Sequence, residues 1–266
     1  MHFLRERFVS ITKRTPDLHG GINFRDIGGY SSRDGRRVVW RKLLRSGHLA
    51  NLSDSDLSVL SSIGVNQIHD FRREDEQLRS PSRVMNVEII ANYHISVGSI
   101  SRFWDYLRDG NLTLQSARNL VIDSYRDCIE EVAPAYTRFL QKILDNADGT
   151  SVFHCAAGKD RTGMAAALIL AALDIPRATI IEDYLLTEKH LDSDNLMTII
   201  EKHLIDAKVQ YWERDWLLPY CTVCAENIEA FFNAIDERFG SVDQYLDQAL
   251  GLGKKGRERI QELFLE

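Results

Sequence analysis

Cysteine and proline are both scarce in this sequence of 266 residues. The four cysteines are too few for a disulfide framework at this length, so we expect free thiols. Five prolines and no long Gly/Ser stretch leave no evident linker, which favours one domain over residues 1–266. No apolar run approaches the roughly 20 residues that span a bilayer, and residues 1–10 lack the apolar centre of a signal peptide. We therefore expect a cytoplasmic protein without a transmembrane segment, while secretion as an effector without a standard signal peptide stays open.

An excess of positive charge is also lacking. Lysine and arginine number 33 against 39 aspartate and glutamate residues, which gives a formal net charge of −6. Proteins that bind nucleic acid usually carry a basic footprint, so we expect no nucleic-acid partner. A small phosphate site needs positive charge only locally, and the global balance does not oppose one.

What the sequence does contain is an alternation of predicted strands and helices. Apolar runs predict strands over 37–44, 65–71, 87–93 and 150–154. Apolar spacing and capping residues predict helices over 54–63, 112–127, 131–146, 162–173 and 241–250, with another to about 265. The first of these should begin at the N-cap Ser53 and end at Gly64. This order predicts an α/β fold, with a mostly parallel sheet of about four to five strands flanked by helices.

One loop in this pattern is placed to bind an anion. The segment His154-Cys-Ala-Ala-Gly-Lys-Asp-Arg-Thr-Gly163 follows an apolar strand and leads into a nearly continuous apolar helix. Ligands bind at the carboxyl ends of parallel strands. A helix N-terminus adds unpaired N–H groups and the positive end of the helix dipole. The backbone alone therefore predicts an oxyanion site.

The side chains of this loop add a nucleophile and a charge. Cys155 and Arg161 stand six positions apart. A cysteine at a helix N-terminus beside cations can have its pKa depressed to about 3.5–7.5, and Lys159 and His154 could contribute such charge. The planar guanidinium of Arg161 can hold two phosphate oxygens at once. We therefore assign catalysis to Cys155 and Arg161.

The rest of the loop would complete the cradle for the anion. Its small residues leave the backbone N–H groups free to converge on phosphate oxygens. The Thr162 hydroxyl could donate to the sulfur, and Lys159 would be a second cation. We assign phosphate contacts to Ala156, Ala157, Gly158, Lys159, Thr162 and Gly163, and a supporting role to His154 and Asp70.

The loop resembles that of the protein-tyrosine-phosphatase superfamily, and most closely its bacterial and fungal branch with the motif HCxxGKDRTG. The similarity extends over nearly the whole chain. It includes Asn23–Gly29 (NFRDIGG), Leu44–Gly47 (LRSG), His69–Arg72 with Glu74, Asp183–Leu185 (DYL) and Tyr245-Leu246. This resemblance implies the phosphatase fold.

The resemblance also implies a reaction. Cys155 would take the phosphoryl group of a monoester, and water would then hydrolyse the phosphocysteine. The loop supplies the positive charge, so we expect neither a metal nor another cofactor. The substrate would be a phosphotyrosyl protein, for a tyrosine or dual-specificity phosphatase. A lysine such as Lys159 also occurs in phosphatases of phosphoinositides, which makes an inositol lipid the alternative substrate.

The proton donor for the leaving group is less evident. In a mycobacterial member of this branch an aspartate follows the strand equivalent to 87–93, but residues 93–98 here contain no acid. Asp160, inside the loop, is the candidate on proximity, although it could instead orient Arg161 or Lys159. Asp70 more simply bonds nearby backbone, and Asp105 more simply lies on an exposed helix face.

Two further segments have two interpretations each. Residues 94–128, with aromatic side chains at 103, 104 and 106, form either a helical lid over the site or helices packed permanently on the core. The pair Cys221 and Cys224 forms a lone CxxC, for which we favour two ordinary thiols over a redox or zinc site, since no further ligands lie close by.

Other functions fit the loop less well. A rhodanese-type sulfurtransferase also uses a loop cysteine but would lack the Cys-x5-Arg-Thr arrangement. An arsenate reductase would need shuttle cysteines, for which Cys128 or Cys221 are only guesses. A non-catalytic phosphate-binding module would be expected to lose Cys155 or Arg161, and both are present.

Overall fold

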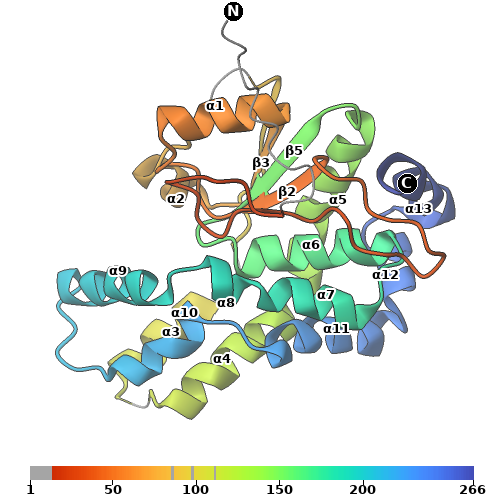
Figure 1. Ribbon diagram of the computed structural model, residues 1–266. Helices are drawn as coiled ribbons and strands as arrows, with labels where there is room; N and C mark the ends of the chain where they lie inside the picture. Colours follow the sequence, from red (N-terminus) through yellow and green to blue (C-terminus); the bar gives the residue numbers. More distant parts are fainter. Residues whose placement is uncertain (1–13, 85–86, 97–98, 111) are drawn as a thin grey trace, which may run out of the picture.

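The computed structural model describes residues 14–266, apart from 85–86, 97–98 and 111. A five-stranded sheet in the order β1-β2-β5-β3-β4 lies at its centre (Figure 1). β1 runs antiparallel to β2, and all other neighbours are parallel. The strands are β1 (Arg25–Asp26), β2 (Leu43–Ser46), β3 (Val65–Asp70), β4 (Ile89–Asn92) and β5 (Thr150–His154). The predicted α/β fold with a mostly parallel sheet is confirmed.

The predicted strand over 37–44 is wrong in its extent. β2 begins only at Leu43, because Arg41 has a left-handed backbone conformation (φ 63°) that turns the chain. Upstream of that turn, Val38 forms an isolated bridge with Leu265 near the C-terminus. The two-residue strand β1 was not predicted, since its identity as a strand depends on pairing with β2.

Helix α1 (Asp54–Ile63) covers one face of the sheet, as Figure 1 shows. Its start is fixed locally: the Ser53 hydroxyl accepts from the Asp56 amide, and the Asp56 carboxylate accepts from the Ser53 amide. Gly64, with φ 87°, ends it. Both ends match the prediction. Leu57 and Leu60 pack on this face against Leu44, Ile68 and Val152 of three strands.

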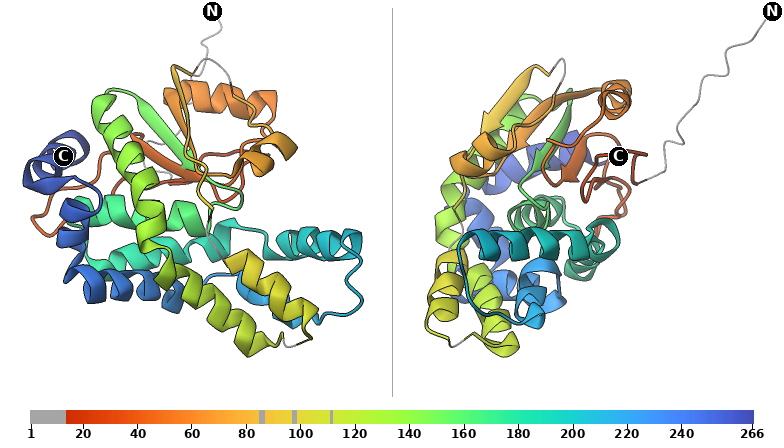
Figure 2. Two further views of the ribbon diagram at one scale, coloured as in Figure 1. Left: turned by 180° about the vertical axis from the view of Figure 1, so that it is seen from behind. Right: turned by 90° about the vertical axis from the view of Figure 1, so that its left-hand side faces the viewer.

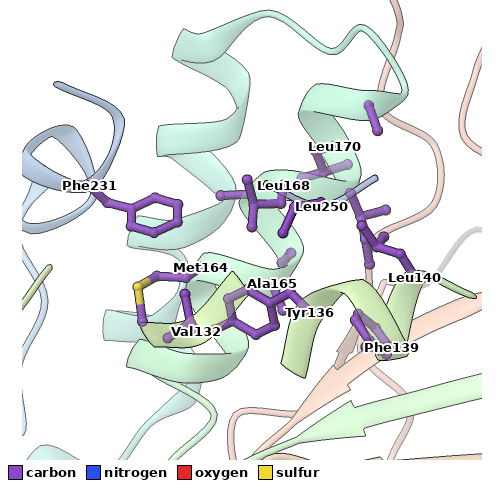
Figure 3. Close-up of a cluster of buried hydrophobic side chains, with 14 of the residues drawn as sticks. Val132, Tyr136, Phe139, Leu140, Met164, Ala165, Leu168, Leu170, Phe231 and Leu250 are labelled. Carbon is purple, nitrogen blue, oxygen red and sulfur yellow. The ribbon is translucent and has the colours of Figure 1, made fainter. Parts of the chain in front are cut away.

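The opposite face carries α5 (Ile129–Asp145) and α6 (Asp160–Ala172). Leu43 and Phe153, next in sequence to Leu44 and Val152, point to this side, as the alternation of a strand requires. Figure 3 shows the resulting core, in which side chains of α5 interdigitate with those of α6. It labels Val132, Tyr136, Phe139, Leu140, Met164, Ala165, Leu168 and Leu170, together with Phe231 and Leu250 from later in the chain.

The second half of the chain is mainly helical, as predicted. Beyond α6 lie α7 (Arg177–Leu185), α8 (Thr187–His190), α9 (Ser193–Asp206), η1 (Arg214–Leu217), α10 (Leu218–Cys221), α11 (Ala225–Phe239), α12 (Val242–Gln248) and α13 (Gly253–Phe264). Pro176 directly precedes α7, and Ser241 caps α12. Figure 2 shows α7 and α11 packed beneath α6, so the helices form layers below the sheet.

Residues 94–128 contribute α3 (Ser99–Arg108) and α4 (Leu114–Asp127), whereas 97, 98 and 111 lie outside the described residues. Phe103 is buried against the Tyr220 ring of α10, at 4.7 Å between centroids, and Tyr106 is exposed. With α9 and η1 these helices share a separate apolar cluster far from the sheet (Figure 1). The aromatic face of α3 thus packs on α10. Movement of this segment as a lid stays a prediction.

Candidate active site

The predicted loop connects β5 to α6 at the carboxyl edge of the sheet. In Figure 1 it lies between α2 (Glu74–Arg79) and α8. Ala156 and Ala157 line a cavity of about 440 Å³, which α2, α8 and α9 enclose. Cys155 is only 3% exposed. The cysteine is therefore buried directly before the two loop residues that line the cavity, and it is not itself a lining residue.

The backbone N–H groups of this loop are unused. Among the described residues, none of the amides from 156 to 162 donates a hydrogen bond to another protein group. The amide of Gly163 is different, because it already donates to the Lys159 carbonyl at 3.1 Å within the first turn of α6. The free amides could form the predicted cradle, whereas the Gly163 amide is already engaged. A Cβ at Gly163 would lie 2.9 Å from the Tyr184 ring, so this glycine serves close packing.

The carbonyl groups of the loop, in contrast, are held from outside. The His48 amide donates to the Ala156 carbonyl at 2.8 Å. The Asn23 side chain donates to the carbonyls of Ala157 (3.2 Å) and Gly158 (2.9 Å). Because N–H and C=O of one peptide unit point in opposite directions, tying the carbonyls outward turns the amides toward the interior of the loop. Asn23, in the segment NFRD, and His48, directly after the segment RSG, thus hold the loop's carbonyl groups on the side away from its interior.

Gly158 is needed where the loop passes closest to β2. Its φ of 67° is left-handed, and a Cβ there would lie 2.5 Å from backbone atoms of Ser46 and Gly47. The loop can lie this close to the sheet only because residue 158 has no side chain.

A buried ion cluster supports the same carbonyl. Arg45 donates to the Gly158 carbonyl at 3.0 Å and to Asp183 at 2.6 Å, and Arg25 pairs with the other oxygen of Asp183 at 3.4 Å. Tyr30 also donates to Asp183. Burial alone would raise the pKa of Asp183, but the charges of Arg25 and Arg45 lower it to about 2. Asp183 is therefore ionised at neutral pH and compensates both arginines.

The guanidinium of Arg161 is fixed by a carboxylate that the sequence analysis missed. Glu76 of α2 accepts two hydrogen bonds from it, at 2.7 and 2.9 Å. Burial would raise the pKa of Glu76, but hydrogen bonds and charge from Arg161 hold it below the ordinary value. The sequence comparison had paired the motif with Glu74. The sequence signal that bears on the choice between Glu74 and Glu76 is the helical spacing, because these two residues lie on different faces of α2.

Lys159 and Asp160 form a pair beside the loop. Lys159 is 3% exposed, and its ammonium contacts Asp160 at 3.0 Å and the Thr222 carbonyl at 3.1 Å. Asp160 also accepts from the Tyr125 hydroxyl at 2.6 Å. The predicted second cation is thus engaged with protein groups, while the Asp160 side chain remains 40% exposed.

His154 and Asp70 lie side by side at the ends of β5 and β3. Asp70 accepts three hydrogen bonds from the Arg72 guanidinium, at 2.7 to 3.1 Å. His154 Nδ1 is 3.2 Å from the Cys155 carbonyl, which can only accept, so Nδ1 carries the hydrogen. Burial lowers the pKa of His154 to about 4. His154 is therefore neutral at pH 7, and the expectation that its charge assists Cys155 is wrong.

One other predicted contact, that of Thr162, differs in the structure, whereas Asp105 lies on an exposed helix face as expected. The Thr162 hydroxyl lies 3.5 Å from the Ser46 carbonyl, to which it donates, and is not directed at the sulfur. Asp105 pairs with Arg108 at 3.1 Å on the exposed side of α3. This geometry therefore gives neither Thr162 nor Asp105 a contact with the reacting atoms.

The cleft in front of the loop has a mixed lining. Leu196 and Ile199 of α9 give it an apolar wall, opposite Arg79 of α2. Burial lowers the pKa of both His48 and His190, which favours their neutral forms. The cleft next to the loop therefore carries little net charge.

Cys221 is buried and Cys224 is exposed, and both are free thiols. Within the residues that the structure describes, no cluster of three His, Cys, Asp or Glu side chains could hold a metal ion. Nor does any helix in the described ranges have the length and apolar character that crossing a membrane requires.

The chain is similar to known proteins over most of its length. Residues 16–266 match a model described as the tyrosine phosphatase family. A Cupriavidus necator protein assigned as a tyrosine-protein phosphatase is 32% identical over 230 residues, covering 86% of this chain and 81% of the relative. The triple specificity protein phosphatase PtpB of Mycobacterium tuberculosis is 26% identical, with 94% and 98% covered.

Two other similarities are more limited. A tyrosine-protein phosphatase of Nostoc commune is 28% identical over 149 residues, covering 56% of this chain and 49% of that protein. The crystal structure of Pseudomonas aeruginosa TpbA covers 73% of this chain and 96% of its own, with a TM-score of 0.34 and 14% identity. On the full-length match, the chain belongs to the tyrosine phosphatase family.

Proposed function

We propose that this enzyme hydrolyses phosphate monoesters through a phosphocysteine on Cys155. One observation carries the proposal: the loop that directly follows Cys155 borders a cleft through Ala156 and Ala157, and the loop amides from 156 to 162 donate to no described protein group. Such an arrangement binds the equatorial oxygens of a phosphoryl group in its transition state without reorganisation. Arg161, held by Glu76, would add a guanidinium to the same oxygens.

In the first step the Cys155 thiolate donates an electron pair to phosphorus and forms the S–P bond. The bond from phosphorus to the ester oxygen breaks, and its electron pair stays on that oxygen. The oxygen takes a proton from the Asp160 carboxyl and leaves as an alcohol or phenol. In the second step Asp160 removes a proton from a water molecule that attacks phosphorus, the S–P bond breaks, and Cys155 is again a thiolate.

The surroundings of the other acids favour Asp160 in this role. Both carboxylate oxygens of Asp70 accept hydrogen bonds from Arg72. The pKa of Asp70 lies below the ordinary value, because nearby His154 and these hydrogen bonds outweigh the effect of burial. Asp105 is paired with Arg108. Asp160 stands at the first turn of α6, next to Arg161, with a partly exposed carboxyl.

A phosphotyrosyl protein is the substrate we propose. The cleft offers apolar contact through Leu196 and Ile199 and little uncompensated positive charge, which suits an aromatic ring better than a polyphosphorylated headgroup. Lys159, the residue that suggested a phosphoinositide, has its ammonium occupied by Asp160 and the Thr222 carbonyl. We also propose a cytoplasmic location, where thiols such as that of Cys155 are kept reduced.

The test is turnover of an aryl phosphate by the wild type, Cys155→Ser and Asp160→Asn. We expect Cys155→Ser to lose activity by roughly a thousandfold or more while still binding phosphate. Wild-type turnover in Cys155→Ser would overturn the mechanism. Phosphotyrosyl peptide, phosphoseryl peptide and phosphoinositide vesicles, compared side by side, test the substrate; preference for the vesicles would overturn that part alone.

A further inference from the structure

A buried tyrosine outside the loop contacts the proposed proton donor. Tyr125 of α4 is 1% exposed and belongs to the main apolar core, so its hydroxyl is buried. A buried hydroxyl requires partners, and this one has two: the Asp160 carboxylate at 2.6 Å and the Tyr184 hydroxyl at 2.7 Å. The contact links α4 to the first turn of α6.

The hydrogens of this network have one consistent direction. A carboxylate only accepts, so the single hydroxyl hydrogen of Tyr125 goes to Asp160. Tyr184 must then donate to Tyr125, which leaves the Tyr184 oxygen to accept from the Asn227 amide at 3.5 Å. Burial raises the pKa of Tyr125 and Tyr184 well above the ordinary value, so both phenols keep their hydrogens at neutral pH. The series of hydrogen bonds from Asn227 through Tyr184 to Tyr125 thus directs one O–H donor at Asp160.

Only one oxygen of the Asp160 carboxylate is used. Tyr125 and Lys159 both bond Oδ1, at 2.6 and 3.0 Å. No described protein group bonds Oδ2, and the side chain is 40% exposed. A carboxyl held through Oδ1 keeps Oδ2 in a fixed orientation and without a described protein partner, as proton transfer to a leaving group requires.

From this geometry we infer that Tyr125 is a positioning residue for the proton transfer by Asp160. The inference rests on the proposed function. Tyr125 does not touch the substrate; it orients Oδ2 and stabilises the carboxylate that remains once the proton has left. Its hydrogen bond strengthens as Asp160 becomes charged, because bonds to an ionised acceptor are stronger.

Several other charged or ionisable groups face Asp160. Their contributions stay in place when the Tyr125 hydroxyl alone is removed. They are Lys159, Arg161, Tyr184 and Cys128. A change in pH dependence on removal of that hydroxyl therefore reports on this bond.

The experiment measures kcat and kcat/KM of Tyr125→Phe against pH, for aryl phosphates whose leaving groups differ in pKa. We expect roughly a tenfold loss with the poorest leaving group and a much smaller loss with the best one, since a general acid matters most when the leaving group is poor. The basic limb of the profile should move to higher pH, because a carboxylate that has lost a donor keeps its proton longer.

Tyr245→Phe is the matched control. Tyr245 is fully buried, and its hydroxyl makes one bond, to the Ile129 carbonyl at 2.5 Å. Its variant loses a buried hydroxyl without touching Asp160, so pH profile and leaving-group dependence should stay as in the wild type. Tyr184→Phe is the second variant, to be used if Tyr125→Phe does not fold. We expect it to have a smaller effect in the same direction as Tyr125→Phe.

The outcomes separate this inference from the proposed function. An equal loss on all substrates, or an unchanged pH limb, in Tyr125→Phe and Tyr184→Phe would make Tyr125 merely structural and overturn the inference. If Asp160→Asn in the same series shows the leaving-group effect, the proposed acid stands even then. If Asp160→Asn shows none, the acid role and the inference fall together, while Cys155→Ser still tests the nucleophile.

Discussion

The two sides of the active-site cleft are built differently. Behind the phosphate loop, the supporting groups are polar and fully buried, and they bond backbone carbonyls at fixed distances. Across the cleft, α9 presents apolar side chains such as Ile199, which is 44% exposed. Under the proposed function, the loop must keep one geometry for the chemistry, whereas the wall would contribute only contact area to a substrate.

Breaking the ion cluster behind the loop should have the largest effect. Asp183→Asn leaves Arg25 and Arg45 buried without a compensating charge, and removing one partner of a buried pair costs about 3–5 kcal/mol of unfolding free energy. Urea denaturation at neutral pH measures it. The exposed pair of Arg33 and Asp174 is the control, and Asp174→Asn should cost less than about 1 kcal/mol. Equal costs would contradict the comparison.

The same carboxylate predicts a pH dependence. The pKa of Asp183 is about 2 in the folded protein against an ordinary 3.8, so its contribution is complete above 3.8 and is lost as pH falls toward 2. The wild type should therefore lose its stability advantage over Asp183→Asn across that window. An advantage that did not change with pH would mean that Asp183 is not the charged partner.

Replacing Arg161, the cation of the loop, should have the next-largest effect. In Arg161→Lys the fork that bonds Glu76 twice is lost, and an ammonium cannot hold two phosphate oxygens in the same plane. We expect kcat/KM for an aryl phosphate to fall by about a hundredfold or more. Glu76→Gln, which keeps the guanidinium but loosens it, should fall less. Equal losses in the two variants would contradict the assigned roles.

Gly158→Ala sharpens the comparison at the point of closest approach. The new Cβ would meet β2 backbone at 2.5 Å in addition to the strain of a positive φ. Gly251 has a similar φ of 63° with no atom within 4 Å of a Cβ, so Gly251→Ala bears the strain alone. Thermal or urea unfolding should show Gly158→Ala to be less stable by about 1–3 kcal/mol. Equal stabilities would mean that the loop can move away from the sheet.

The cleft wall should give the smallest effect. Ile199→Ala removes part of the apolar lining, so we expect KM for a phosphotyrosyl peptide to rise about threefold or less, with kcat unchanged. Ile205, on the same helix and 61% exposed, does not line the cavity, and Ile205→Ala should leave KM unchanged. Equal changes in both variants would exclude a specific contact with the wall.

Much of the fold could be predicted from the sequence, because its signals are local. The reciprocal bonds of Ser53 and Asp56 and the left-handed Gly64 fix α1 without reference to the rest of the chain. Val65 and Ile68 marked β3, and Val152 and Phe153 marked β5. The error over 37–44 arose where tertiary pairing decides, since Val38 pairs with the C-terminal Leu265 rather than extending β2.

The site could be predicted in its motif but not in its partners. Cys155 and Arg161 are near in sequence, so their proximity follows from the spacing. Glu76 reaches Arg161 only because α2 packs beside the loop. Lys159 turns to Thr222, more than sixty positions along the chain. Burial of His154 depends on the assembled core, and the sequence therefore could not indicate that it is neutral.

The most direct test of the mechanism is to trap the intermediate. The enzyme would be mixed with an aryl phosphate, quenched in acid within its first turnovers, digested and analysed by mass spectrometry. The account predicts one phosphoryl group on the peptide that contains Cys155, absent in Cys155→Ser. A phosphoryl group on any other residue, or turnover that continues without Cys155, would contradict it.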